Sequence, residues 1–302
     1  MRGLIVTSFR VLILIVIFMA GAAATVMAQP SGKGPGTVRI VASFYPVYIM
    51  ARNVAKNIPG VTVTSLTPSV SGCLHDYAVT VDDLKKLAGA DVFIVNGAGM
   101  ESFLERVITQ FPRVRVVPLA EGIPLIYGKG ASGPNPHVWV SISNAILEVR
   151  SLSVAMEAID PVHAKGYRKN SDEYILELER LRAQMQSELA PYKGQKIITF
   201  HEAFPYFARE FGFEVAAVIE REPGSDPSAR ELAETVDVIR SSGIRTVFIE
   251  PQYPLGAAAA IARETHVRVL TLDPAVNGED DDGAYIRIMR KNLEGLKDAF
   301  SK

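Results

Sequence analysis

Three histidines and one aspartate in this chain have the residue types and the spacing of a metal site. His75, His137, His201 and Asp273 each lie near a turn or a rigid neighbour such as Pro136, and the chain has only five histidines. Imidazole together with carboxylate suits a divalent transition metal, above all zinc. Successive members lie about 60 to 70 residues apart, so they cannot form a local finger. We expect distant loops to meet, with a cleft between two lobes as the meeting place.

The remaining candidates for metal chemistry are weaker. Cys73 lies two residues from His75, and its thiolate would bind zinc well, but a buried and inert cysteine is the commoner outcome. Glu250 ends a strand-like run, where it could orient a ligand histidine or serve as a structural hydrogen-bond acceptor. His163 and His266 lie in helix-start and helix-end contexts, and we expect both to be solvated.

The first 28 residues read as a secretion signal. Arg2 and Arg10 give a positive start, residues 11–25 are almost wholly apolar, and Val26-Met27-Ala28 offers a cleavage point. The alternative is an uncleaved anchor, but the apolar run is near the short end for a membrane span. We therefore predict an exported, periplasmic protein that is soluble after cleavage.

The remaining chain alternates short β-branched runs with helical patterns, which is typical of parallel βαβ units. The expected strands are 38–42, 61–66, 91–95, 113–117, 196–200, 214–219, 246–249 and 267–272. The expected helices are 47–56, 81–87 with Thr80 as N-cap, 100–110, 204–211, 228–241, 257–265 and 284–300. The two halves carry similar orders of elements, as expected for a pair of α/β lobes.

One stretch breaks this rhythm. Residues 161–189 contain no glycine after Gly166, and apolar residues recur at helical spacing from Tyr174 to Met185. We predict an α/β fold in which two lobes, each a parallel sheet flanked by helices, are joined by one long rigid helix. The predicted division is a signal peptide at 1–28, an N-terminal lobe at 36–160, a connecting helix at 161–190 and a C-terminal lobe at 191–302.

Composition and motifs narrow the function. The chain has 32 basic and 33 acidic residues and a formal net charge of −1, so nothing favours nucleic acid or an anionic membrane. A catalytic zinc needs an open position and a nearby base. Glu202 or Glu250 could be that base, but the sequence lacks HExxH, a nucleophile elbow and a phosphate-binding loop. We therefore expect that this protein is not an enzyme. A zinc-dependent hydrolase and a surface adhesin with a structural metal stay open as alternatives.

Several motifs together resemble a known family, the zinc/manganese group of extracytoplasmic solute-binding proteins of bacterial ABC importers. The motifs are Ser43-Phe44-Tyr45-Pro46, Gly72 to Tyr77, Ala90-Asp91-Val92-Phe93 with Asn96-Gly97, Asn135-Pro136-His137-Val138-Trp139, His201 to Phe207, Phe248-Ile249-Glu250-Pro251-Gln252 and Leu272-Asp273-Pro274. The resemblance covers nearly all of the chain after the signal. It implies two lobes joined by a long helix, with the metal between them.

Carried over by position, the resemblance assigns His75 and His137 to the first lobe, and His201 and Asp273 to the second. It implies Zn²⁺ as transported ligand, an ABC transporter membrane permease as partner, and a monomer. Manganese-type relatives tend to have Glu at the third position, where this chain has His201. The sequence departs from many zinc-type relatives because residues 121–135 lack a histidine-rich loop. Mn²⁺ therefore stays an alternative.

Overall fold

The computed structural model describes residues 37–68, 74, 77–128, 133–219, 228–253 and 255–301. The predicted signal peptide at 1–28, Cys73 and the predicted ligand His75 lie outside these described residues. No helix in the described ranges is both long enough and apolar enough to cross a membrane.

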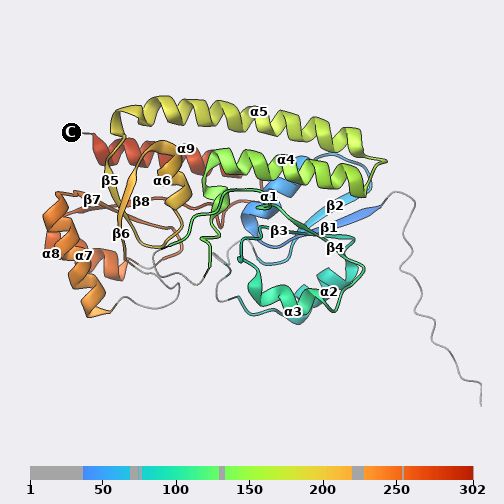
Figure 1. The fold of residues 1–302 in the computed structure, drawn as a ribbon, viewed down its shortest axis with the longest axis horizontal. Helices are drawn as coiled ribbons and strands as arrows, with labels where there is room; N and C mark the ends of the chain where they lie inside the picture. Colours follow the sequence, from blue (N-terminus) through green and yellow to red (C-terminus); the bar gives the residue numbers. More distant parts are fainter. Residues whose placement is uncertain are drawn as a thin grey trace, which may run out of the picture. The chain divides into compact units, whose positions relative to one another are not determined.

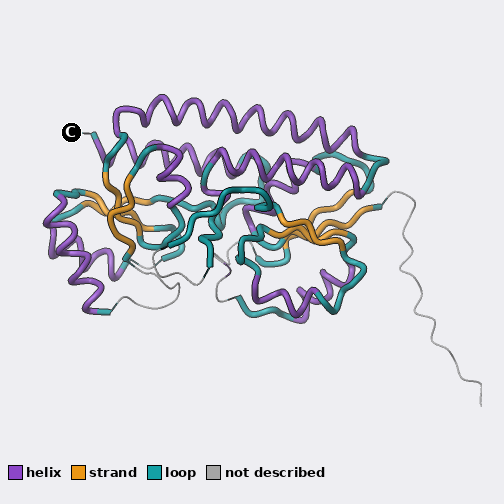
Figure 2. The backbone as a smooth tube through the Cα atoms, viewed as in Figure 1, coloured by secondary structure: helices purple, strands orange, loops and turns teal. Residues whose placement is uncertain are grey.

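Two parallel sheets carry the fold, as expected. The first has the order β2-β1-β3-β4 and the second the order β6-β5-β7-β8, and every strand pair is parallel. The strands are β1 (Val38–Ala42), β2 (Val61–Ser65), β3 (Val92–Val95), β4 (Arg115–Pro118), β5 (Lys196–Thr199), β6 (Glu214–Val218), β7 (Thr246–Ile249) and β8 (Arg268–Thr271). Both sheets thus share one order, and Figure 2 shows them as two separate groups of strands.

Helices cover these sheets and connect them (Figure 1). They are α1 (Tyr45–Val54), α2 (Val81–Gly89), α3 (Glu105–Ile108), α4 (Ile142–Ile159), α5 (Ala164–Leu189), α6 (Pro205–Phe211), α7 (Ala229–Ser242), α8 (Gly256–Thr265) and α9 (Ala284–Phe300). We call the elements from β1 to α4 the first lobe and those from β5 to α9 the second lobe. The helix α5 lies between the two in sequence and is described separately. The described residues also form the short 3₁₀ turns η2 (Ser102–Leu104), η3 (Val138–Val140) and η4 (Ala190–Tyr192).

Local signals placed most of these elements correctly. Thr80 caps α2 in a reciprocal box with Asp83, and Ser228 caps α7 in the same way with Glu231. Gly212 and Gly243 end α6 and α7 in the left-handed conformation that glycine adopts at low cost. The helix expected at 100–110 was too long, because the chain forms η2 and then only the four residues of α3.

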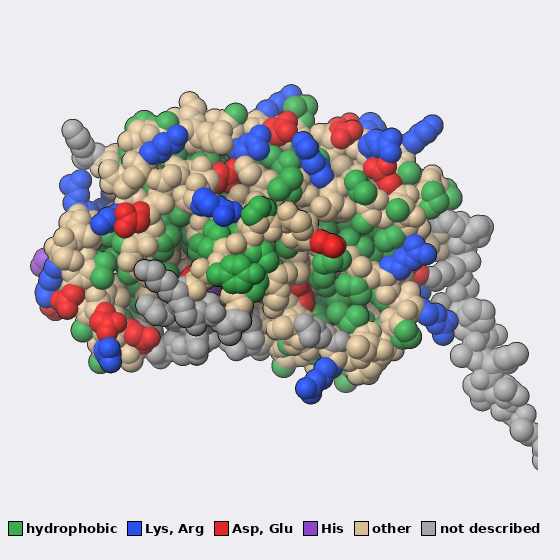
Figure 3. Space-filling model, viewed as in Figure 1, with side chains coloured by type: hydrophobic (Ala, Val, Ile, Leu, Met, Phe, Trp, Pro, Cys, Tyr) green, Lys and Arg blue, Asp and Glu red, His purple; other side chains and the backbone are tan. Residues whose placement is uncertain are grey.

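The long helix α5 joins the two lobes. Its 26 residues pack against α1 and α4 of the first lobe and against α6 and α9 of the second. The buried side chains Tyr167, Tyr174, Leu178, Leu181 and Met185 lie along its inner face. Its outer face is charged, and acidic and basic side chains are intermingled along the upper edge of the molecule in Figure 3.

The main hydrophobic core runs from one lobe into the other. It includes Ile40 of β1, Ile146 of α4, Phe207 of α6 and Leu293 of α9, all of them buried. Smaller cores fill the opposite face of each sheet. The predicted division at 36–160, 161–190 and 191–302 stays a prediction, and the core crosses its boundaries. Packing of this kind favours small relative displacements of the lobes over large hinge rotations.

Candidate metal site

Two of the predicted ligands, His137 and His201, come together from different lobes. His137 lies just before η3, and His201 lies in the corner between β5 and α6. Their Nε2 atoms are 3.1 Å apart, and both residues are 2% exposed. Two nitrogens bound to one tetrahedral zinc at about 2.0–2.1 Å would lie about 3.3–3.4 Å apart. The pair therefore fits a shared zinc ion with little adjustment.

The orientation of the His137 ring is fixed by Asn135. The side-chain oxygen Oδ1 of Asn135 lies 3.0 Å from the backbone N of His137 and 3.1 Å from its ring Nδ1. The side-chain nitrogen Nδ2 of Asn135 donates to the carbonyl of Glu202 at 2.7 Å, which fixes the orientation of the amide. An amide oxygen only accepts, so His137 carries its proton on Nδ1. Its Nε2 lone pair is then directed at His201.

Further contacts between the lobes support these two histidines. The Tyr206 hydroxyl donates to the carbonyl of Asn135 at 2.8 Å and accepts from the backbone N of Ile126 at 2.9 Å. The Asn135 side chain is bonded to the backbone next to His201. The loop before α4 and the corner before α6 are thus joined directly.

A carboxylate from the second lobe also caps α4 of the first. Glu210 on α6 accepts from the hydroxyl of Ser141 at 2.7 Å and from the hydroxyl and backbone N of Ser143 at 2.5 and 3.1 Å. An anion at a helix N-terminus satisfies free N–H groups and interacts favourably with the helix dipole. Since α4 begins directly after η3, this cap fixes the helix that follows His137.

Asp273 lies at the carboxyl end of β8, where open α/β sheets normally bind ligands. Asn292 of α9 holds its backbone on both sides, accepting from its N at 2.8 Å and donating to its carbonyl at 2.7 Å. The Oδ1 atom of Asp273 accepts a hydrogen bond from the backbone N of Ala275 at 2.8 Å. Burial raises the pKa of the Asp273 carboxyl, while the hydrogen bond from Ala275 and then the charge of Lys291 oppose this shift. A divalent cation would offset the cost of a buried carboxylate.

Trp139 connects the Asp273 segment to the His137 segment. Its indole N–H donates to the carbonyl of Pro274 at 2.7 Å, and its ring centroid lies 5.3 Å from that of His137. The Tyr285 hydroxyl donates to the backbone carbonyl of Trp139 at 2.7 Å. The tryptophan therefore packs beside one predicted ligand and holds the residue next to another.

The complete predicted set reaches beyond the described residues. Within them, no group of three or more His, Cys, Asp or Glu side chains is close enough together to hold a metal ion, and His75 lies outside them. The set of His75, His137, His201 and Asp273 stays a prediction, of which the contact between His137 and His201 is observed.

Other predicted residues have ordinary partners. Glu250 is buried and accepts from the side-chain nitrogen of Gln252 at 2.5 Å, so a role in orienting a ligand histidine stays a prediction. His266 is exposed in the left-handed residue after α8, as expected for a solvated histidine. The same expectation for His163 was wrong, because its ring is partly buried and its Nδ1 lies 2.7 Å from Asp160.

Several residues that shape the surroundings of the histidines were not predicted from the sequence. Asn135 was noted only as part of a motif, although an asparagine two residues before a ligand histidine is a usable signal. Glu210, Tyr206 and Asn292 carried no signal, because their partners are distant in sequence. Glu148 of α4 was missed as well, and it is a buried carboxyl whose oxygens have no hydrogen-bond partner among the described residues.

Comparison with known proteins assigns the family. Residues 40–299 match the model of the family described as zinc-uptake complex component A, periplasmic. The chain belongs to this family.

Two relatives have names that agree with this assignment, and a solved structure of a solute-binding protein shares the fold. The high-affinity zinc uptake system protein ZnuA of Bacillus subtilis is 29% identical over 87% of this chain and 88% of its own length. The zinc-binding lipoprotein AdcA of Streptococcus pneumoniae is 27% identical over 88% of this chain, which spans only 56% of AdcA. The solute-binding protein FpvC of Pseudomonas aeruginosa, solved with Mn²⁺, is 30% identical with a TM-score of 0.79 over 87% of this chain and 98% of FpvC.

Proposed function

We propose that this chain captures zinc outside the cytoplasmic membrane and delivers it to the permease of an ABC importer. The observation that carries the proposal is the 3.1 Å contact between the Nε2 atoms of His137 and His201. Asn135 directs one of these nitrogens toward the other, and the two residues come from different lobes. Capture and release, without turnover of a substrate, is the role of the zinc-uptake family.

Zinc is the cargo that the donor set favours. Three imidazoles and one carboxylate suit tetrahedral zinc, whereas manganese prefers more oxygen atoms and more ligands. We propose His75 and Asp273 as the third and fourth ligands. The structurally similar FpvC was solved with Mn²⁺ and also with Ni²⁺, so proteins of this fold bind other divalent ions as well. Selectivity is therefore part of the test.

We further propose that residues 1–28 are removed on export and that the chain acts as a monomer in the periplasm. Closed coordination by four protein groups would give high affinity and leave no open position for a catalytic water. This favours a binding protein over a zinc-dependent hydrolase. Release then requires the permease to displace one or more ligands, because the packing between the lobes opposes spontaneous opening.

The test is a zinc titration of the purified chain from residue 29 onward, with manganese as competitor. We expect one zinc ion per chain and a preference for zinc over manganese. His137→Ala and His201→Ala should each weaken zinc binding by orders of magnitude. His266→Ala is the matched control, because that ring is exposed at the end of α8. Equal losses in the control, or an equal preference for manganese, would contradict the proposal.

A further inference from the structure

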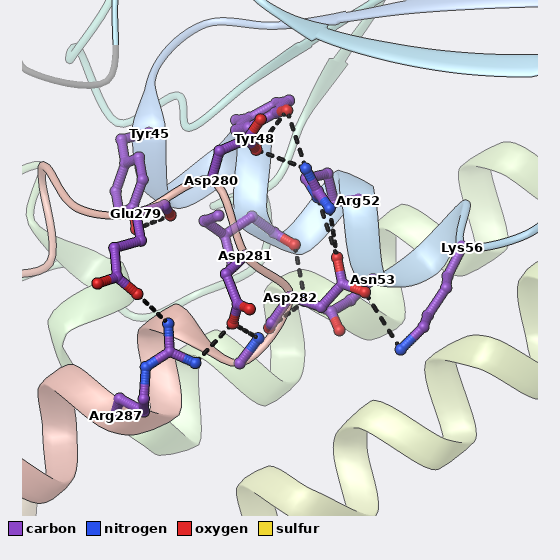
Figure 4. Close-up of polar contacts among 12 residues, drawn as sticks. Tyr45, Tyr48, Arg52, Asn53, Lys56, Glu279, Asp280, Asp281, Asp282 and Arg287 are labelled. Carbon is purple, nitrogen blue, oxygen red and sulfur yellow. Dashed lines mark hydrogen bonds and ion pairs between the residues drawn. The ribbon is translucent and has the colours of Figure 1, made fainter.

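The segment that follows Asp273 leaves the second lobe and lies against the first. Between Asp273 and α9, the chain passes over α1, and Ala275 and Val276 are buried in the main core. Residues 279–282, which we call the acidic loop, carry four consecutive carboxylates. Figure 4 shows this loop between Arg52 and Lys56 of α1 on one side and Arg287 of α9 on the other.

Ion pairs with α1 hold the side chains of the acidic loop. Arg52 places Nη1 2.5 Å from Asp280 and Nη2 2.9 Å from Asp282. Lys56 adds a third pair, with its Nζ 3.1 Å from Asp282. The guanidinium of Arg52 thus bridges two loop carboxylates, a geometry that a lysine could not reproduce.

Hydrogen bonds from α1 hold the backbone of the same loop. The Tyr45 hydroxyl donates to the carbonyl of Glu279 at 2.8 Å, and the Asn53 side chain donates to the carbonyl of Asp282 at 2.9 Å. Gly278 has a φ of +155°, and a Cβ at this position would clash with the Tyr45 hydroxyl oxygen. The loop therefore passes so close to Tyr45 that any residue larger than glycine at position 278 would push the loop away from α1.

These contacts fix the far end of a segment whose near end carries a predicted zinc ligand. At the near end, Asn292 holds the backbone of Asp273, and Trp139 binds the carbonyl of Pro274. At the far end, Arg52 is only 30% exposed and Asp282 only 27%, so this ion pair is less screened by solvent than a fully exposed one. Asp273 belongs to the second lobe in sequence, but its segment is attached to the first lobe at both ends.

We propose that Arg52, through the acidic loop, is a positioning residue for the zinc ligand Asp273. The inference rests on the proposed function, because it concerns the same site. It makes the loop a strap that keeps Asp273 in register with His137 of the first lobe. The carboxylates of the loop are occupied by basic side chains, so their role is to hold the loop rather than to gather metal ions.

A double-mutant cycle on zinc affinity tests the proposal. The variants are Arg52→Ala, Asp273→Ala and the double variant, with Arg268→Ala as control because Arg268 pairs with Asp298 within the second lobe. We expect Arg52→Ala to weaken zinc binding about tenfold at most, the low end of the loss for a direct partner of a metal ligand, because Arg52 acts on Asp273 only through the loop. Arg52→Lys should recover part of this loss, and Arg268→Ala should have no effect.

The decisive result is the double variant. If Arg52 acts through Asp273, adding Arg52→Ala to Asp273→Ala weakens binding no further. Additive losses would overturn the proposal, as would unchanged affinity in Arg52→Ala. Asp280→Asn with Asp282→Asn gives a second route that leaves α1 intact, and it should match Arg52→Ala.

Amide exchange separates failure of this inference from failure of the proposed function. Without added zinc, Arg52→Ala should speed exchange across residues 275–283 relative to the wild-type chain, whether or not the protein binds zinc. No change in exchange would overturn the strap by itself. Absence of zinc binding in the wild-type chain would instead overturn the proposed function.

Discussion

Replacing Asn135 with alanine should weaken zinc binding without removing any ligand. The Asn135 side chain makes three hydrogen bonds, accepting from the N and Nδ1 of His137 and donating to the carbonyl of Glu202. Alanine frees the His137 ring to rotate or to change tautomer, and it removes one link between the lobes. Loss of such an orienting partner typically costs 10- to 100-fold in metal affinity, which corresponds to about 1.4–2.7 kcal/mol.

The assay is competition for zinc against a chromophoric chelator, combined with urea unfolding. Asn170→Ala is the matched control, because the Nδ2 of Asn170 also donates to backbone carbonyls, those of Val54 and Lys56, and these bonds join α5 to the end of α1 rather than holding His137 or His201. Both variants should lose about 1–2 kcal/mol of unfolding free energy. Only Asn135→Ala should lose zinc affinity.

A conservative variant separates the two roles of Asn135. Asn135→Asp keeps an acceptor for the His137 ring but cannot donate to Glu202. It should therefore bind zinc more tightly than Asn135→Ala, and ¹⁵N chemical shifts should still show His137 protonated on Nδ1. The reasoning is refuted if Asn135→Ala binds zinc within twofold of the wild-type chain, or if Asn170→Ala loses as much affinity.

Glu148, Glu210 and the proposed imidazole ligands each lead to a further prediction. Burial, and then the charge of Glu101, raise the pKa of Glu148 well above its usual value. The native state therefore keeps a proton that the unfolded chain releases above about pH 4.3, and the unfolding free energy should fall as pH rises. Relative to the wild-type chain, Glu148→Gln should be more favoured at pH 8 than at pH 5, and urea titrations that give the same stability difference between variant and wild type at both pH values would be inconsistent with this. Glu210→Ala, which uncaps α4, should lower unfolding free energy by about 2 kcal/mol, whereas Glu214→Ala, in the exposed pair with Lys196, should change it little in the same assay. Zinc affinity should fall steeply as pH drops below ~6.5 because protons compete for neutral imidazole, and the raised pKa of Asp273 adds to this loss; affinity that stays flat between pH 7.5 and pH 5.5 would count against histidine ligands.

Local sequence signals predicted most of the fold. Strands such as β1 and β7 are short β-branched runs, and the ends of α6 and α7 are marked by glycine. The pattern failed for α4, over which no element was predicted. Some of its apolar residues are buried where α1 and α5 pack against it, but Leu147 and Val154 are exposed, so the one-sided periodicity of a surface helix is weak.

The candidate site was predictable in part, for a similar reason. His137 and His201 could be paired because each lies in a turn context and because imidazole implies metal chemistry. The residues that surround them could not be predicted, because each of their contacts joins residues more than 60 positions apart. These contacts are Asn135 with Glu202, Glu210 with Ser141, and Arg52 with Asp282. Such contacts depend on how the lobes pack, which single-residue propensity does not determine.

The packing between the lobes also changes how the connecting helix is understood. A rigid α5 was predicted from its scarcity of glycine and from the helical spacing of its apolar residues. In the structure, the shared core and the acidic loop provide additional contacts between the lobes, beside the helix. Several contacts acting together, and not the helix alone, would then keep the lobe displacement on zinc binding small.

Anomalous diffraction at the zinc absorption edge, from crystals of the zinc-loaded chain, tests the central claim most directly. We predict one peak between the Nε2 atoms of His137 and His201, about 2.0–2.1 Å from each, with His75 and Asp273 completing the coordination. A peak elsewhere on the chain, or no peak after zinc loading, would contradict the account.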